Sequence, residues 1–88
     1  MTYTVLIIDD EKNARENISK YLEKRGYETC QAGSIKESNK FIKEGIADII
    51  VLDVQLPDGY GVGYLSELSK LPNRPPVILI TGHGDIES

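Results

Sequence analysis

The 88-residue sequence has a single cysteine, no excess of positive charge and no long apolar run. Cys30 therefore cannot form an intramolecular disulfide, and we interpret it as a small buried hydrophobic residue. A net charge of -4, without a cluster of lysine and arginine, argues against direct binding of nucleic acid. The N-terminus lacks the basic start and cleavage site of a signal peptide, and no apolar run approaches the about 18 residues of a membrane-spanning helix. We expect a cytoplasmic protein with no membrane segment.

The composition is that of one globular domain. Hydrophobic residues make up 40% and charged residues 27% of the chain, and 88 residues leave no room for a second domain. A domain of this size buries only about 60% of the surface of its unfolded chain, so its core is thin. We expect residues 1–88 to form a single domain that is destabilised by the loss of any one helix or strand.

Short apolar runs alternate with amphipathic stretches along the chain. The runs predict four strands, over residues 5–8, 27–32, 47–52 and 76–80. The stretches predict three helices, over residues 13–25, between residues 34 and 45, and over residues 61–71. Strands that alternate with helices at this spacing pair in parallel through right-handed crossovers. The sequence therefore predicts an α/β fold with helices on both faces of a parallel sheet.

Capping signals mark the ends of the first two helices. Asn13 with Glu16, and Ser34 with Glu37, have the spacing of a capping box, in which each side chain bonds the other residue's backbone. Two glycines stand where these helices are expected to end, Gly26 and Gly45. The boundaries of both helices are therefore predicted from local chemistry.

Acidic residues follow two of the predicted strands at the point where each strand ends. Asp9 and Asp10 come after the first strand, and Asp53 comes after the third. The carboxyl ends of parallel strands lie along one edge of a sheet, and ligands bind there where the strand order reverses. If the first and third strands are neighbours, the three carboxylates converge at this edge. Thr81 follows the fourth strand and is expected at the same edge.

Three converging carboxylates repel one another and imply a bound cation. Oxygen ligands suit Mg²⁺ or Mn²⁺, and Mg²⁺ is favoured because it takes one or two protein carboxylates, keeps several waters and bridges to phosphoryl oxygens. A carboxylate beside such a metal can itself be the nucleophile and form an aspartyl-phosphate. The pattern thus indicates phosphoryl transfer to Asp53.

Each of these residues also has a simpler interpretation. Asp10 and Glu11 precede a helix, where the macrodipole favours acids. Asp58 lies between a proline and a glycine and is best explained as a turn residue. Thr81 alone is an ordinary hydroxyl at a strand end, and His83 has no identifiable partner. The combination of these positions is much more specific than any one of them.

Three segments together resemble the receiver domain of two-component response regulators, in order and in spacing. They are VLIIDDE near the N-terminus, IIVLDVQLPDGYG in the middle and PVILITGHGD later. The resemblance covers all 88 residues. It implies a flavodoxin-like, doubly wound parallel sheet with strand order 2-1-3-4-5.

The resemblance also implies a role for each matching residue. Asp53 matches the phospho-accepting aspartate, and Asp9 and Asp10 match the acidic pair that holds Mg²⁺. Gln55 matches the position whose backbone carbonyl completes the metal site. Thr81 matches the switch hydroxyl that turns toward the phosphoryl group. The partners implied are a histidine kinase or a phosphotransfer protein.

The sequence departs from the receiver pattern after the fourth predicted strand. Receivers continue with a fourth helix, a fifth strand that ends in a phosphate-binding lysine, and a fifth helix, whereas this sequence ends at Ser88. We therefore expect residues 1–88 to form an incomplete receiver with strand order 2-1-3-4. We also expect impaired phosphorylation, and self-association as a homodimer or larger assembly through the exposed fourth strand.

The leading hypothesis is a phosphoacceptor that assists its own phosphorylation and is not a turnover enzyme. An alternative from another class is an oligomerisation module that keeps the receiver scaffold and carries only residual acids. An aspartate-nucleophile phosphatase is disfavoured, because such enzymes place a second acid two residues after the nucleophile, where Gln55 stands here.

Overall fold

The computed structural model describes residues 2–56, 59–71 and 74–80. Helices and strands alternate along the chain as the sequence predicts, with one additional short hairpin. The elements are β1 (Thr4–Ile8), α1 (Lys12–Lys24), β2 (Glu28–Ala32), α2 (Ile35–Glu44), β3 (Ile49–Asp53), β4 (Gln55–Leu56), β5 (Gly59–Tyr60), α3 (Gly61–Leu68) and β6 (Val77–Ile80). Among the described residues, no helix is both long and apolar enough to cross a membrane.

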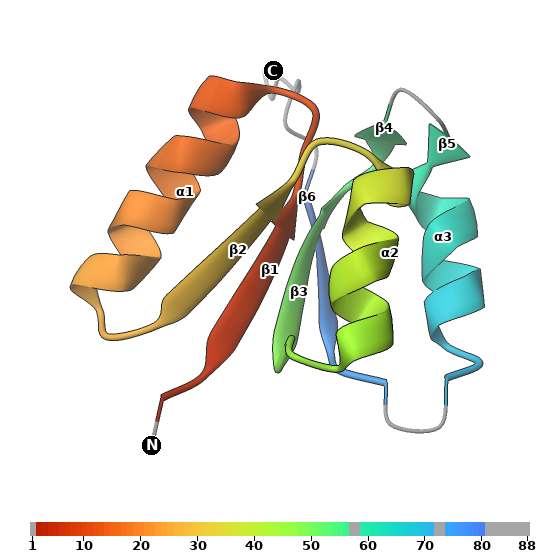
Figure 1. Ribbon diagram of the computed structural model, residues 1–88. Coiled ribbons are helices and arrows are strands. Elements are labelled where there is room, and N and C mark those ends of the chain that lie inside the picture. The colour runs from red at the N-terminus through yellow and green to blue at the C-terminus, as the bar shows by residue number, and fades with distance from the viewer. Residues whose placement is uncertain (1, 57–58, 72–73, 81–88) are drawn as a thin grey trace.

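Four strands form one parallel sheet in the order β2-β1-β3-β6. Helix α1 covers one face of this sheet, and α2 and α3 cover the other (Figure 1). The fold is therefore flavodoxin-like, and β6 takes the place of the fourth predicted strand. Because β1 and β3 are direct neighbours at the centre, the chain segments that follow them leave the sheet side by side. This arrangement confirms the condition on which the convergence of the acids depended.

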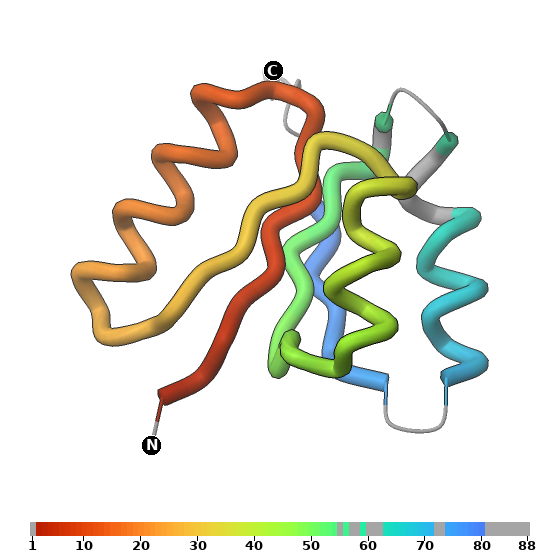
Figure 2. The backbone as a smooth tube through the Cα atoms, viewed as in Figure 1, coloured from red at the N-terminus to blue at the C-terminus, as the bar shows by residue number. Residues whose placement is uncertain are grey.

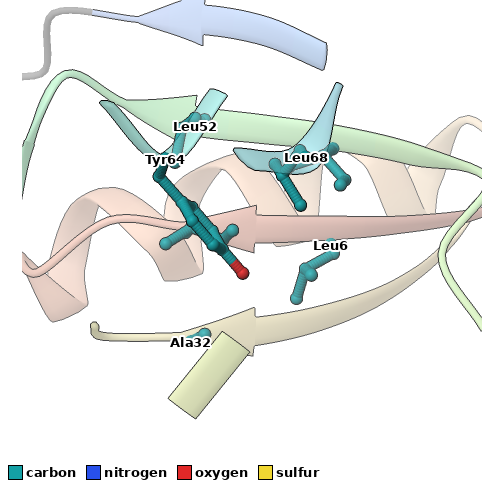
Figure 3. Close-up of a cluster of buried hydrophobic side chains, with 7 residues drawn as sticks. Leu6, Ala32, Leu52, Tyr64 and Leu68 are labelled. Carbon is teal, nitrogen blue, oxygen red and sulfur yellow. The ribbon is translucent and has the colours of Figure 1, made fainter. Parts of the chain in front are cut away.

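The two central strands are buried on both faces, because each face carries its own helical layer. Leu6 and Leu52 point toward α2 and α3, where Tyr64 and Leu68 pack against them (Figure 3). Ile7 belongs to a second cluster on the α1 side of the sheet. Burial on both sides explains the nearly continuous apolar runs in these strands. The sheet is thus a rigid base for the residues at its carboxyl edge.

The predicted cap at Ser34 and the glycine at the end of α2 are confirmed, whereas the reciprocal bond of Glu37 goes to the amide of Gly33 and not to that of Ser34. The Ser34 hydroxyl accepts a hydrogen bond from the Glu37 amide at 3.1 Å, and the Glu37 carboxylate accepts one from the Gly33 amide at 2.6 Å. Gly45 ends the helix with φ at 68°, and Gly26 follows α1 with φ at 94°. Both glycines therefore occupy the left-handed conformation that favours this residue.

The predicted N-cap of α1 is wrong. The helix begins at Lys12, with Glu11 in the capping position and no side-chain cap, so Asn13 lies inside the first turn. The physical reason is the preceding acid: the Asp9 carboxylate accepts a hydrogen bond from the Glu11 amide at 3.0 Å and turns the chain earlier. A side chain of the candidate site therefore organises the start of the helix.

Two further differences lie beyond β3. Helix α3 ends at Leu68 and not at Leu71, because the chain tightens there into bonds between residues three apart, including Leu71 N to Leu68 O at 3.1 Å. The sequence predicted only a turn where β4 and β5 form a short antiparallel pair. Asp58, Thr81 and His83 lie outside the described residues.

Candidate phosphoryl-acceptor and metal site

Three carboxylates meet at the carboxyl edge of the sheet, where β1 and β3 end. Ile8 is in register with Leu52, so the next residue on each strand path is an aspartate. One carboxylate oxygen each from Asp9, Asp10 and Asp53 lies within 4.8 Å of the other two. The structure thus brings together the three acids that the sequence singled out.

Asp9 is held by hydrogen bonds from both its backbone and its side chain. Its amide donates to the Ala32 carbonyl at 3.0 Å, which extends the β1–β2 pairing by one residue. One side-chain oxygen, Oδ1, accepts from the Glu11 amide. The other, Oδ2, is buried and has no hydrogen-bond partner among the described residues. This oxygen is available to a ligand that brings its own positive charge.

Asp53 is the last residue of β3 and is fully buried, with 0% of its surface exposed. It is in register with Ile80 of β6, and the Val54 amide that follows it donates to the Ile80 carbonyl at 3.0 Å. The backbone on both sides of this carboxylate is therefore fixed by sheet hydrogen bonds. A side chain held in this way needs little reorganisation before it binds a ligand or reacts.

The surroundings of Asp9 disfavour its charged form. Burial raises the pKa of Asp9 above its ordinary value, the Glu11 amide lowers it, and the carboxylates of Asp53 and Asp10 raise it further. A positive ion between these groups would reverse both unfavourable contributions at once. The electrostatics of the cluster therefore favour cation binding.

The donor set fits a magnesium ion. Mg²⁺ holds its oxygen ligands at about 2.1 Å, so three oxygens within 4.8 Å of one another can close around it by movement of their side chains. The orphaned Oδ2 of Asp9 supplies one buried oxygen, and the exposed Asp10 leaves room for water ligands. Gln55 lies in β4, next along the chain from this cluster. Its expected role through the backbone carbonyl stays a prediction.

Sequence reasoning missed a residue beside this cluster. Arg15, in α1, donates from Nη1 to the Asp9 carbonyl at 2.9 Å and from Nε to the Gln31 side chain at 3.3 Å. The sequence shows only that an arginine follows the acidic pair by five residues. Spacing alone does not predict that its side chain turns back to the Asp9 carbonyl.

Comparison with known proteins places the chain in a family. Residues 5–88 match the model of the response regulator receiver domain. The chain therefore belongs to the response regulator receiver family and is a receiver domain of the two-component type.

Individual relatives agree with this assignment. The chain is 34% identical over 82 residues to Nodulation protein W of Bradyrhizobium diazoefficiens, a match that covers 93% of this chain and 36% of that protein. The beryllofluoride-activated receiver domain dimer of NtrC4 superposes with a TM-score of 0.83 at 40% identity, over 94% of this chain and 69% of that one. TrrA of Thermotoga maritima with Mg²⁺ and beryllofluoride superposes with a TM-score of 0.84 at 31% identity, over 91% of this chain and 70% of that one. The chain thus spans about a third of the length of Nodulation protein W.

Proposed function

We propose that Asp53 accepts a phosphoryl group and that Asp9 and Asp10 hold the metal ion that supports this transfer. The observation that carries the proposal is the fully buried Asp53 carboxylate at a strand end, with two more carboxylates within 4.8 Å. A structural role offers no reason to collect three like charges at the edge of a sheet. Transfer of a phosphoryl group beside a bound cation gives such a reason.

The chemistry assigned to these residues is a simple displacement. An oxygen of the Asp53 carboxylate attacks the phosphorus of a phosphohistidine, the new O–P bond forms, and the P–N bond breaks as the imidazole nitrogen takes the bonding pair and a proton. Mg²⁺, or Mn²⁺ in its place, neutralises the charge of the phosphoryl oxygens when bound. In this proposal the Gln55 carbonyl completes the metal site, and the Thr81 hydroxyl turns toward the phosphoryl group.

The proposed donor is a histidine kinase or a phosphotransfer protein. A crystal structure of TrrA in complex with the histidine kinase ThkA superposes on this chain with a TM-score of 0.84 at 30% identity. We assign the chain no turnover reaction, since receiver domains are phosphoacceptors. A cytoplasmic location, where such a donor can reach Asp53, is part of the same proposal.

The direct experiment is labelling of residues 1–88 with acetyl phosphate, read by intact mass and peptide mapping. We expect slow, partial labelling that requires Mg²⁺ and is confined to Asp53, because the sequence has no lysine after Lys70 to neutralise the phosphoryl group. Asp53→Asn should abolish the label. Asp48→Asn, at the exposed opposite end of β3, should leave it unchanged. A label on another residue, or no label that depends on Mg²⁺, would contradict the assignment.

We further propose that residues 1–88 self-associate through β6. Among the described residues β6 pairs only with β3, and its outer positions Ile78 and Leu79 are 54% and 41% exposed. An uncharged, apolar edge strand is a template for a second copy of the same strand. The dimeric NtrC4 receiver shows that a relative with 40% identity assembles in pairs.

Sedimentation of residues 1–88 at micromolar concentration tests this assembly. We expect a dimer or larger species for the native sequence and a monomer for Leu79→Lys, because a charge on the edge opposes strand pairing. Tyr21→Lys is the matched control, since it places the same charge at an exposed aromatic residue of α1. A monomeric native chain would contradict the proposal. Assembly without Mg²⁺-dependent labelling would instead favour the alternative, an oligomerisation module with residual acids.

A further inference from the structure

Arg15 makes two hydrogen bonds that tie the start of α1 to the carboxyl ends of β1 and β2. Nη1 donates to the backbone carbonyl of Asp9 at 2.9 Å, and Nε donates to the side chain of Gln31 at 3.3 Å. The β1–α1 and β2–α2 connections run beside each other at this end of the sheet (Figure 2). The guanidinium therefore spans two connections that the backbone brings together.

The carbonyl that Arg15 holds belongs to the peptide unit between Asp9 and Asp10. A peptide unit is planar, so fixing its oxygen fixes the direction in which the chain enters Asp10. The other side of Asp9 is already fixed by the bond from its amide to the Ala32 carbonyl. Arg15 thus completes the restraint on the backbone that carries both acids.

The absence of a side chain at Gly33 leaves room for the guanidinium of Arg15. A Cβ atom on Gly33 would lie 3.1 Å from Arg15 Nη1 and 3.3 Å from the Glu37 carboxylate, closer than ordinary contact. Glycine at this position therefore leaves space for the guanidinium. A basic side chain near the start of a helix is also disfavoured by the macrodipole. Helix stability alone does not account for an arginine here.

We infer that Arg15 is a positioning residue, which holds the Asp9–Asp10 peptide so that both carboxylates face the metal with Asp53. The inference rests on the proposed metal site. A positioning role and a purely electrostatic role of Arg15 predict opposite changes in Mg²⁺ affinity when Arg15 is replaced. Loss of a nearby positive charge alone would strengthen Mg²⁺ binding to an acidic site, whereas loss of the restraint weakens it.

The experiment measures the Mg²⁺ affinity of residues 1–88 and of five variants by titration followed in amide NMR spectra. Arg15→Met should weaken binding about tenfold, the low end of the range for residues that orient metal ligands. Arg15→Lys keeps the charge but not the forked contact, and its affinity should fall between those of Arg15→Met and the native chain. Gln31→Ala and Gly33→Ala should each weaken binding by a smaller factor, because they disturb the arginine without removing its charge.

Lys20→Met is the matched control, since it removes one positive charge from an exposed position of α1 and should not weaken binding. Equal or tighter Mg²⁺ binding by Arg15→Met would overturn the inference. If Arg15→Met does not fold, unchanged affinity in Gln31→Ala and Gly33→Ala would overturn it. A native chain that does not bind Mg²⁺ at Asp9, Asp10 and Asp53 would contradict the proposed function itself.

Discussion

Asp53→Asn is expected to make the metal-free protein more stable. The native carboxylate is fully buried and lies close to those of Asp9 and Asp10, so folding without a cation brings like charges together. Replacing it with a neutral side chain of similar shape should raise the free energy of unfolding at neutral pH by about 1 kcal/mol. For a domain of this size that corresponds to about 4–8 °C in Tm.

The stability of the metal-free native protein should also depend on pH, and the direction of this dependence follows from Asp9. Because the folded-state pKa of Asp9 is raised above 3.8, the folded protein keeps a proton there that the unfolded chain has already released. The stability of the metal-free native protein should therefore fall as pH rises from 3.8 through the raised pKa. Asp53→Asn should flatten this fall, since it removes one of the charges that raise the pKa.

Thermal unfolding in the presence of a chelator, repeated across this pH range, is the measurement. Asp48→Asn is the control: it removes an exposed carboxylate that accepts a hydrogen bond from the Thr4 amide at 2.8 Å, so it should not raise stability. A lower Tm for Asp53→Asn than for the native protein would contradict the account.

The strand order and the meeting of the acids could be predicted because both follow from simple regularities. Buried strands such as Leu6 to Ile8 are marked by continuous apolar residues, and parallel pairing then places every strand end at one edge. The cap at Ser34 was predictable for a similar reason, since its partner Glu37 lies three residues away. Local signals were sufficient where the interaction was local.

The start of α1 could not be predicted from its own sequence. Asn13 and Glu16 have the spacing of a capping box, but the Asp9 carboxylate accepts a hydrogen bond from the Glu11 amide, and the N-cap lies two residues earlier, at Glu11. A residue of the site thus overrides a local preference. Places where sequence rules fail in this way are expected at functional sites.

Contacts between distant side chains were also missed. Tyr64 was not predicted in the core, yet it is 5% exposed and its hydroxyl contacts the Ser38 hydroxyl at 2.9 Å and the Asn39 side chain at 3.0 Å. These partners are on α2, 26 and 25 residues away. Neither this pairing nor that of Arg15 with Gln31 leaves a periodic signal in the sequence, because each depends on how two elements pack.

Mg²⁺ binding at the three acids is the second large effect that we expect. The ion should bind weakly where the ends of β1 and β3 meet, and its effects should be confined to that edge of the sheet. Removal of a charged ligand by Asp53→Asn or Asp9→Asn should weaken it at least about tenfold. Asp48→Asn should leave it unchanged, because that carboxylate lies at the opposite end of β3.

A Mg²⁺ titration of residues 1–88, followed residue by residue in ¹H–¹⁵N NMR spectra, tests directly whether the three acids form a metal site. We expect saturable shifts that centre on residues 9, 10 and 53–55 and that are lost in Asp53→Asn. Shifts spread evenly over the acidic residues of the surface, or unchanged by Asp53→Asn, would contradict this expectation.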